Sequence, residues 1–306
     1  MSLSLLDVDN LVSLVHAQYS KTGFKPSNEY QFTVLAAFVL SRTSNSGADS
    51  ETEARHDFKV ISLATGSKCL PKSRLPPRGD TLHDSHAEVL ARRGAVRWLY
   101  EEIRRCCAGG DTSEWIQRRA SSGKYALNDG VELHMYISTI PCKHSQIPYQ
   151  NTPLTCFLGG DASTRLLAST QLIQDPSMAT LKSTSSFAPL PPNAASRGRD
   201  NYALLGVLRT KPGRADSPPT ISMSCSDKIA SWCVLGTQGA LASEVMQPVY
   251  SRGLVVGLDD VPEEESVREM VREDCERAVC GRLEGFEGVY VDLCIYREVN
   301  LRTPGF

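Results

Sequence analysis

The sequence predicts an α/β fold in which helices alternate with the strands of a central sheet. Apolar residues recur at helical spacing over residues 5–20 and 85–106, and the charged stretch 263–282 is also typical of a helix. Residues 58–63 and 131–138 have the composition of strands, and the second of them alternates apolar and polar side chains. Because the two kinds of element alternate along the chain, an α/β sandwich is expected.

Further elements complete this outline. The apolar run at residues 31–41 predicts a helix, and another helix is predicted from about residue 226 to 234. The polar, Gly- and Ser-rich residues 42–56 predict a loop. Residues 183–200 are rich in Pro and Ser and predict a disordered surface insertion. No internal repeat is found, and residues 1–306 are expected to form a single domain.

The composition restricts the class of protein. The chain has 306 residues, of which 41% are hydrophobic, so it can bury a sizeable core. Its net charge of −2 argues against a protein that coats nucleic acid non-specifically, but leaves room for a nucleic-acid enzyme with local positive charge.

The chain also lacks signals for membranes or export. It contains no run of about 18 apolar residues and no signal peptide at its start, so we expect no membrane span and a cytoplasmic or nuclear protein that is not secreted. The ten cysteines are irregularly spaced, which predicts free thiols and a few metal ligands rather than a disulfide framework.

The strongest chemical signal is the run His86-Ala87-Glu88 at the start of a predicted helix. Zinc enzymes that deaminate nucleobases combine a His or Cys ligand with a glutamate that moves protons without binding the metal. A spacing of two places the carboxylate beside the metal. The tripeptide also arises by chance, however, and a solvated helix start explains it without any metal.

Two cysteines stand at similar junctions. Cys142 follows Pro141 at the end of a predicted strand, and Cys225 lies at the start of a predicted helix. A thiolate near a helix start suits a metal ligand, although a buried structural cysteine is the commoner role. One His and two Cys would leave the fourth zinc position to water, as in catalytic sites, while a closed site with four protein ligands stays open as an alternative.

The sequence resembles the editase domain that tRNA-specific and double-stranded-RNA adenosine deaminases share. The resemblance spans roughly residues 30–260 and rests on six runs in order: VISLATGSKC (60–69), LHDSHAEVLARR (82–93), LHMYISTIPC (133–142), GGDAS (159–163), LRTK (208–211) and MSCSDKIASWCVLGTQGALAS (223–243). It implies a cytidine-deaminase-like α/β/α sandwich with a central mixed sheet.

The resemblance implies the chemistry of the site. It assigns a zinc ion to His86, Cys142 and Cys225 and the proton transfers to Glu88. Glu88 would take a proton from the zinc-bound water, hydroxide would attack C6 of a flipped adenine, and ammonia would leave to give inosine.

The resemblance also implies a second cofactor, inositol hexakisphosphate, behind the zinc site. The residues that match its ligands are Arg92, Arg93, Lys228 and Trp232. Asp84 and Lys211 match residues that form a polar relay between this polyanion and the zinc site. Ser67 and Lys68 match the positions at which the family holds the flipped nucleotide. For Arg92 and Arg93 a solvated helix face is the simpler explanation from the sequence alone.

The substrate that the resemblance favours is tRNA, and alanine tRNA in particular, with the target adenosine beside the anticodon. Residues 212–219 match the base-flipping loop and contain small residues, as in the tRNA branch, and we expect no double-stranded-RNA-binding module before the domain. Editing of duplex RNA and a catalytically impaired, RNA-binding relic remain alternatives. A cytidine or free-nucleoside deaminase is disfavoured because those families usually pair their cysteines as P-C-x-x-C.

Residues 143–159 interrupt a run that is continuous in the family, where it reads Pro-Cys-Gly-Asp-Ala-Ser. We interpret this stretch as a non-native insertion, a retained intron. The codons of Cys142-Lys143 and of residues 157–159 can supply an intron donor and an acceptor, and removal of the stretch keeps the reading frame. If translated, it is expected to disturb the helix start behind Cys142.

The second departure concerns the C-terminus. The chain ends at Phe306, where the family continues with a helical part that supplies further lysines to the polyphosphate, so a truncated domain with an incomplete pocket is expected. His83 and Ser231 also stand where the family often has other polar or basic residues around this pocket.

Overall fold

The computed structural model describes residues 3–24, 33–44, 55–109, 113–140, 194–197, 207–211, 218–258, 265–283 and 291–296. The helices described are α1 (Leu5–Lys21), α2 (Ala87–Cys107), α4 (Cys225–Leu235), α5 (Gly239–Ala242) and α6 (Glu265–Val279), with 3₁₀ turns η1 (Lys72–Arg74) and η5 (Gly281–Leu283). The strands described are β1 (Leu35–Ser44), β2 (Arg55–Thr65), β3 (Ser67–Cys69), β4 (Asp84–His86), β5 (Ile116–Arg118), β6 (Tyr125–Leu127), β7 (Val131–Ile137), β8 (Ser196–Arg197), β9 (Arg209–Thr210), β10 (Ser251–Gly257) and β11 (Asp292–Tyr296).

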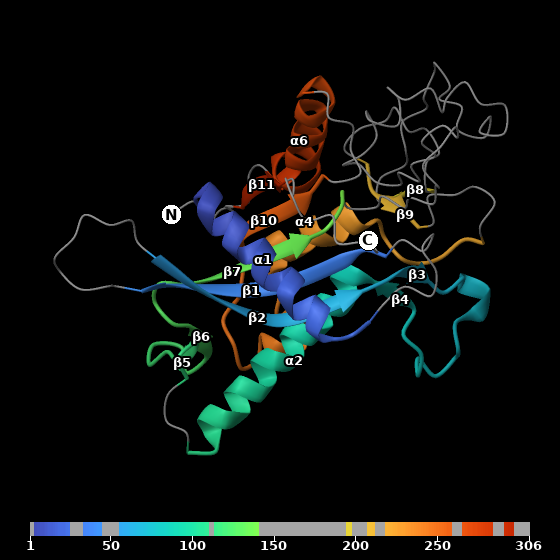
Figure 1. Ribbon diagram of the computed structural model, residues 1–306. Helices are drawn as coiled ribbons and strands as arrows, with labels where there is room; N and C mark the ends of the chain where they lie inside the picture. Colours follow the sequence, from blue (N-terminus) through green and yellow to red (C-terminus); the bar gives the residue numbers. More distant parts are fainter. Residues whose placement is uncertain are drawn as a thin grey trace.

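A five-stranded mixed sheet in the order β11-β10-β7-β1-β2 forms the centre of the fold. Strand β1 pairs antiparallel with β2 and β7, whereas β10 pairs parallel with β7 and β11. Helix α1 crosses one face of this sheet, and α2, α4 and α6 pack on the other (Figure 1). The expected α/β/α sandwich with a central mixed sheet is confirmed.

The helix predicted over residues 31–41 is wrong, because this run forms strand β1. Alternate residues of β1 face opposite sides of the sheet. Phe38 and Leu40 pack in the cluster shared with α2, α4 and α6, whereas Ala37 and Val39 pack under α1. A strand buried on both faces has a continuous apolar sequence, which periodicity cannot distinguish from that of a buried helix.

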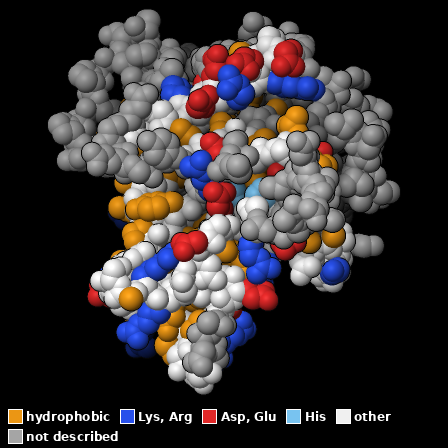
Figure 2. Space-filling model, turned by 90° about the vertical axis from the view of Figure 1, so that its left-hand side faces the viewer, with side chains coloured by type: hydrophobic (Ala, Val, Ile, Leu, Met, Phe, Trp, Pro, Cys, Tyr) orange, Lys and Arg blue, Asp and Glu red, His pale blue; other side chains and the backbone are white. Residues whose placement is uncertain are grey.

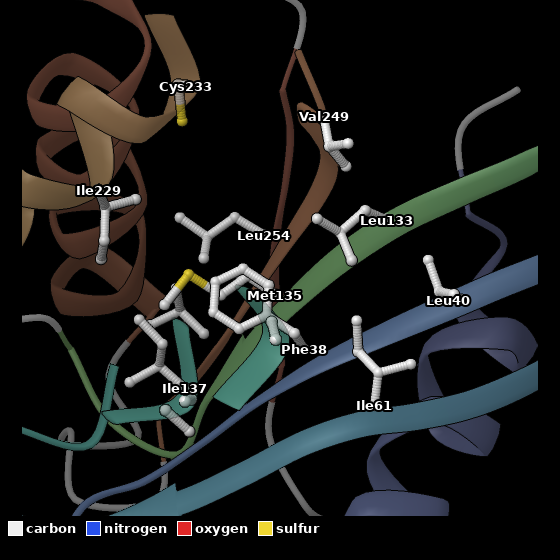
Figure 3. Packing of buried hydrophobic residues seen from close by; sticks show 14 of the residues in the cluster. Phe38, Leu40, Ile61, Leu133, Met135, Ile137, Ile229, Cys233, Val249 and Leu254 are labelled. Carbon is white, nitrogen blue, oxygen red and sulfur yellow. The ribbon is translucent and has the colours of Figure 1, made fainter. Parts of the chain in front are cut away.

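The larger hydrophobic cluster holds α4 against the sheet. In Figure 3, Phe38, Met135 and Leu254 come from the neighbouring strands β1, β7 and β10 and lie close to Ile229 and Cys233 of α4. Each of these side chains is almost fully buried. Burying one such side chain stabilises a fold by roughly 1.5–3 kcal/mol, so this cluster fixes the start of α4 relative to the strands.

The other predicted elements are confirmed with shifted ends. The helices expected over 5–20, 85–106, 226–234 and 263–282 are α1, α2, α4 and α6, and the strands expected over 58–63 and 131–138 are β2 and β7. Of the predicted loop 42–56, residues 42–44 and 55–56 belong to β1 and β2, and 45–54 lie outside the described residues.

Both proposed insertions fall largely outside the described part of the chain. Residues 143–159 lie entirely outside it. Within 183–200 only residues 194–197 are described, and they contain strand β8, which pairs parallel with β9. In the part of the chain that the structure covers, no helix is both long and apolar enough to cross a membrane.

A polar group is buried on the face that α1 covers. His134 of β7 is fully buried, and its Nε2 is hydrogen-bonded at 2.7 Å to the hydroxyl of Ser41 on β1. Burial lowers the pKa of His134 from 6.5 to about 4, with the nearby charges of His56 and Arg252 also lowering this pKa and Asp7 opposing them. His134 is therefore neutral in the folded protein at neutral pH.

We predict that His134 makes the fold less stable in mild acid. The His134 imidazole binds a proton near pH 6.5 in the unfolded chain but only near pH 4 in the folded chain. The free energy of unfolding therefore has its full value above pH 6.5 and decreases as the pH falls towards 4. Protonation of His134 should lower the free energy of unfolding by at most about 3 kcal/mol. Urea unfolding at about pH 7 and about pH 4.5 measures it, and His134→Gln should lose less stability between the two than the wild type.

The control for this experiment is His83→Gln, since His83 is exposed. This variant should show the pH dependence of the wild type. An equal loss of stability on acidification in the wild type and in His134→Gln would contradict the prediction.

Candidate active site

A close approach of two backbones places His86 at the start of α2. Strands β3 and β4 pair antiparallel, with Ser67 opposite His86, and the Ala87 N–H donates a 2.9 Å hydrogen bond to the Gly66 carbonyl. A Cβ atom on residue 66 would lie 2.0 Å from the carbonyl oxygen of Ser85. Only glycine permits this approach, so Gly66 lets the strand end meet the helix start.

His86 is the N-cap residue of α2 rather than a residue inside the helix, and Glu88 lies in the first turn. The Glu88 side chain is buried, with 3% of the residue exposed, and its Oε1 has no hydrogen-bond partner among the described residues. The positive end of the helix dipole favours a carboxylate at this position. A buried carboxylate oxygen without a partner is costly unless a ligand uses it.

Asp84 orients His86. Oδ1 of Asp84 lies 2.8 Å from His86 Nδ1 and also accepts a hydrogen bond from the His86 backbone N–H at 3.1 Å. With Nδ1 held by the carboxylate, the ring nitrogen Nε2 is left as the group that can bind a metal. The pair Asp84–His86 thus has the arrangement that usually orients a metal-binding imidazole.

The second oxygen of Asp84 binds two further groups. The Ser222 hydroxyl and the Lys228 ammonium both donate to Oδ2. Only 2% of Asp84 is exposed, and burial alone would raise the pKa of its carboxyl. The hydrogen bond from His86 and the positive charge of Lys228 outweigh burial and hold this pKa well below its usual range. Asp84 is therefore a fully paired anion.

Lys228 is correspondingly held as a cation. Burial opposes its charged form, but the negative charges of Cys225 and Asp84 and the hydrogen bond to Asp84 raise its pKa above the ordinary value. Lys228 follows Cys225 by three residues on α4, so the two side chains lie on the same face of that helix. The predicted relay residue Asp84 and the predicted polyphosphate ligand Lys228 are thus in direct contact.

Cys225 is the first residue of α4 and is buried. The helix start is fixed by its N-cap Ser224, whose hydroxyl donates a 2.6 Å hydrogen bond to Asp227 and accepts one from the Asp227 N–H at 3.2 Å. Asp227 also accepts a 2.9 Å hydrogen bond from the backbone of Arg209 on β9. The helix N-terminus and Lys228 both favour the thiolate form of Cys225, which is the form that binds metals.

The third predicted zinc ligand, Cys142, lies outside the described residues. Among the residues that are described, no three His, Cys, Asp or Glu side chains are gathered closely enough to hold a metal ion. His86 and Cys225 nevertheless belong to one site, since both neighbour the pair Asp84–Lys228.

Two of the predicted polyphosphate ligands pack together behind this site. The Arg92 guanidinium lies 5.1 Å from the centre of the Trp232 ring, and Trp232 is one turn beyond Lys228 on α4. Arg92 is half-buried, its Nε has no hydrogen-bond partner among the described residues, and burial lowers its pKa. Arg93, in contrast, lies on the exposed side of α2.

The remaining predicted residues flank the network. Lys211 is buried, and its backbone N–H donates a 2.7 Å hydrogen bond to the Ser222 carbonyl. Ser67 is half-buried and Lys68 is exposed, both on β3, beside the strand that carries His86. Residues 212–217 of the predicted base-flipping loop lie outside the described residues.

Sequence reasoning missed Ser222, whose hydroxyl completes the partners of Asp84. The two residues are 138 positions apart, and a serine in a short polar run carries no signal of such a contact. Gly66 was also missed, although a glycine between two strand-like runs is a local sign of close backbone approach.

The adenosine-deaminase (editase) domain family matches residues 62–301, a range that includes every described residue of the network above. The chain belongs to this family.

Relatives of this editase-domain chain include enzymes named for two kinds of RNA. It is 31% identical to the tRNA-specific adenosine deaminase 1 of Schizosaccharomyces pombe over 80% of the chain and 56% of the relative. For the protein of that name in Drosophila melanogaster the identity is 34%, over 83% and 56%. The double-stranded RNA-specific editase Adar of Drosophila melanogaster is 32% identical over 93% of the chain and 36% of the relative. The chain thus spans little more than half the length of these two tRNA-specific relatives.

We predict that the ion pair Asp84–Lys228 is strongly coupled. Replacing one partner, in Lys228→Met or Asp84→Asn, leaves the other polar group buried without its partner and should cost about 3–5 kcal/mol of unfolding free energy. The double variant should cost less than the sum of the two single changes, because it removes both groups together. Urea unfolding of the four proteins measures the coupling.

The matched control is the exposed ion pair Arg272–Glu269 on α6, in which both side chains are 48% exposed. Its variants Arg272→Met and Glu269→Gln should change stability little, because solvent screens such pairs. Strict additivity at Asp84 and Lys228 would contradict the prediction.

Proposed function

We propose that this chain is the catalytic part of a zinc-dependent tRNA-specific adenosine deaminase that converts adenosine to inosine beside the anticodon of alanine tRNA. Membership of the editase-domain family and the names of its relatives support the reaction. The observation that carries the proposal is the buried Glu88 carboxylate, whose Oε1 has no partner among the described residues, two positions from a histidine oriented by Asp84.

The residues fit a catalytic zinc ion. His86 keeps Nε2 for the metal because Asp84 holds Nδ1, and Cys225 stands at a helix N-terminus beside a buried cation. Together with Cys142 they would supply three ligands and leave the fourth position open, as in other catalytic zinc sites. When bound, zinc supplies the Lewis acidity that makes water a nucleophile near neutral pH.

Glu88 carries the proton transfers in this proposal. Its carboxylate accepts a proton from the water that attacks C6 of the adenine, and it returns a proton to the departing amino group, which leaves as ammonia. Burial keeps bulk water away from this carboxylate, so its hydrogen-bonding capacity is directed at the substrate and at the attacking water. Ser67 and Lys68, on the neighbouring strand β3, would hold the flipped nucleotide.

Inositol hexakisphosphate is proposed as a second, structural cofactor. The half-buried Arg92 guanidinium, stacked on Trp232 and with an unpartnered Nε among the described residues, has the chemistry that pairs with a phosphate. Lys228 joins this region to Asp84, and Lys211 neighbours Ser222. The exposed Arg93 would contribute from the rim of such a site.

Adenosines in duplex RNA are a second candidate substrate. The Drosophila editase matches a larger share of this chain, 93%, than the tRNA-specific relatives do. Parallel assays on alanine tRNA and on long duplex RNA distinguish the two substrates.

We predict that Glu88→Gln keeps the zinc ion and loses deamination. The amide preserves the shape of the side chain but cannot accept the proton, so inosine formation in alanine tRNA should fall by at least a factor of about 10²–10⁴. Metal analysis should find the zinc content of the wild type, because Glu88 is not a ligand in this proposal.

His86→Ala and Cys225→Ala are the complementary variants, and both should lose zinc together with activity. Full deaminase activity of Glu88→Gln would contradict the mechanism. A wild-type chain that binds zinc but forms no inosine in either RNA would overturn the proposed reaction in favour of a catalytically impaired relic that binds RNA.

A further inference from the structure

The segment between β3 and β4 carries an unusual set of free cations. Within residues 70–83, the side chains of Lys72, Arg74 and Arg78 are exposed, and Asp80 is the one carboxylate. None of these three cations forms an ion pair with a carboxylate of the described residues. We call residues 70–83 the basic segment. It projects from the body of the molecule beside β3 and β4 (Figure 1).

Several exposed cations elsewhere in the described residues are neutralised locally. At the end of α2, Arg104 and Arg105 pair with Glu101 and Glu102 at 2.9 and 2.7 Å. On the face of the molecule in Figure 2, acidic and basic side chains are interspersed over the described surface. The basic segment gathers three exposed, unpaired cations within residues 72–78, in a chain whose net charge is −2.

The basic segment is held in a defined conformation. The Leu70 N–H donates a 2.7 Å hydrogen bond to the His83 carbonyl and closes its base, and the Lys72 N–H donates one of 2.9 Å to the Pro219 carbonyl. Within the segment the Gly79 N–H donates to the Pro76 carbonyl at 3.2 Å, with Gly79 in a left-handed conformation, φ +66°. Three prolines restrict the backbone further. Ordered cations lose less entropy on binding a ligand.

The position of the segment relates it to the proposed chemistry. It leads directly into β4, which carries Asp84 and His86, and it is anchored through Pro219 to the stretch that carries Ser222. An RNA whose adenosine enters the site must run its phosphodiester backbone past the mouth of the site. Lysine and arginine side chains bind such phosphates, largely independently of the base sequence.

We infer that Lys72, Arg74 and Arg78 bind the phosphates of the RNA strand that flanks the target adenosine. This inference rests on the proposed function, because that function supplies the RNA. The three residues position the strand and do not touch the reacting atoms. They contribute affinity through the release of counterions from the RNA, and a phosphate-binding role therefore has a characteristic dependence on salt.

The test is the binding of a fluorescent alanine-tRNA anticodon stem-loop to the full chain at about 50–200 mM salt. The triple variant K72A/R74A/R78A should bind at least about ten times more weakly at the lowest salt. The slope of log Kd against log salt should fall by about 2, at roughly 0.7 per lost phosphate contact. The charge-conserving variant K72R/R74K/R78K should keep the slope of the wild type.

The matched control is R97A/R104A/R105A, which removes three exposed cations from the middle and the C-terminal end of α2. These residues lie about 16 to 28 Å from His86 along the helix, at its rise of 1.5 Å per residue. The control should keep the slope, and circular dichroism and zinc content should show that all variants fold. An unchanged slope in K72A/R74A/R78A, or an equal loss in the control, would overturn the inference.

The outcomes separate this inference from the proposed function. A wild type that deaminates tRNA while K72A/R74A/R78A keeps its salt slope refutes the phosphate contacts alone. A wild type that forms no inosine, but whose RNA binding depends on the three cations, refutes the deaminase function and leaves the binding surface standing. A wild type that does not bind the stem-loop refutes the inference outright.

Discussion

The Asp84 carboxylate joins two parts of the chain that lie far apart in the sequence, strand β4 and the run from Ser222 into α4. It binds His86 on its own strand, Ser222 in the run that precedes α4, and Lys228 on α4 itself. Burying a carboxylate costs several kcal/mol unless its oxygens are paired, so the arrangement is stable only when both parts of the chain are in place. The relative positions of β4 and α4, and hence of the two proposed zinc ligands that they carry, follow from this one anion.

Two kinds of force hold this arrangement. Hydrophobic packing places α4 on the sheet through Ile229 and Cys233, but apolar contacts are non-directional and leave the rotation and register of a helix only loosely fixed. The hydrogen bonds of Asp84 are directional. They fix which way the imidazole of His86 points and where Lys228 lies along α4. The same anion keeps Lys228 charged, and that charge favours the thiolate of Cys225 three residues earlier.

The sequence predicts the local parts of this structure better than the contacts between them. Periodicity predicted α2 and β7 correctly, because the apolar spacing of the first fits only a helix and the alternation in the second fits only a strand. It failed at residues 31–41, since a strand buried on both faces has no polar face to reveal its period. The motif around His86 could be recognised in the sequence because its residues are adjacent. The hydrogen bond from Ser222 to Asp84 could not be predicted, because it joins residues 138 positions apart and no local sequence pattern indicates it.

The distribution of charge is compatible with the proposed binding of RNA by a nearly neutral chain. Arg104 and Arg105 at the C-terminal end of α2 and Arg272 on α6 are paired with carboxylates one helical turn away, so their fields largely cancel within a few ångströms. The cations of the basic segment have no such partners among the described residues. In the proposed complex, these three cations would attract the phosphates of the RNA beside β4, the strand that carries His86. Net charge is a poor guide to such binding, because the potential that a ligand meets is set by the nearest unpaired groups.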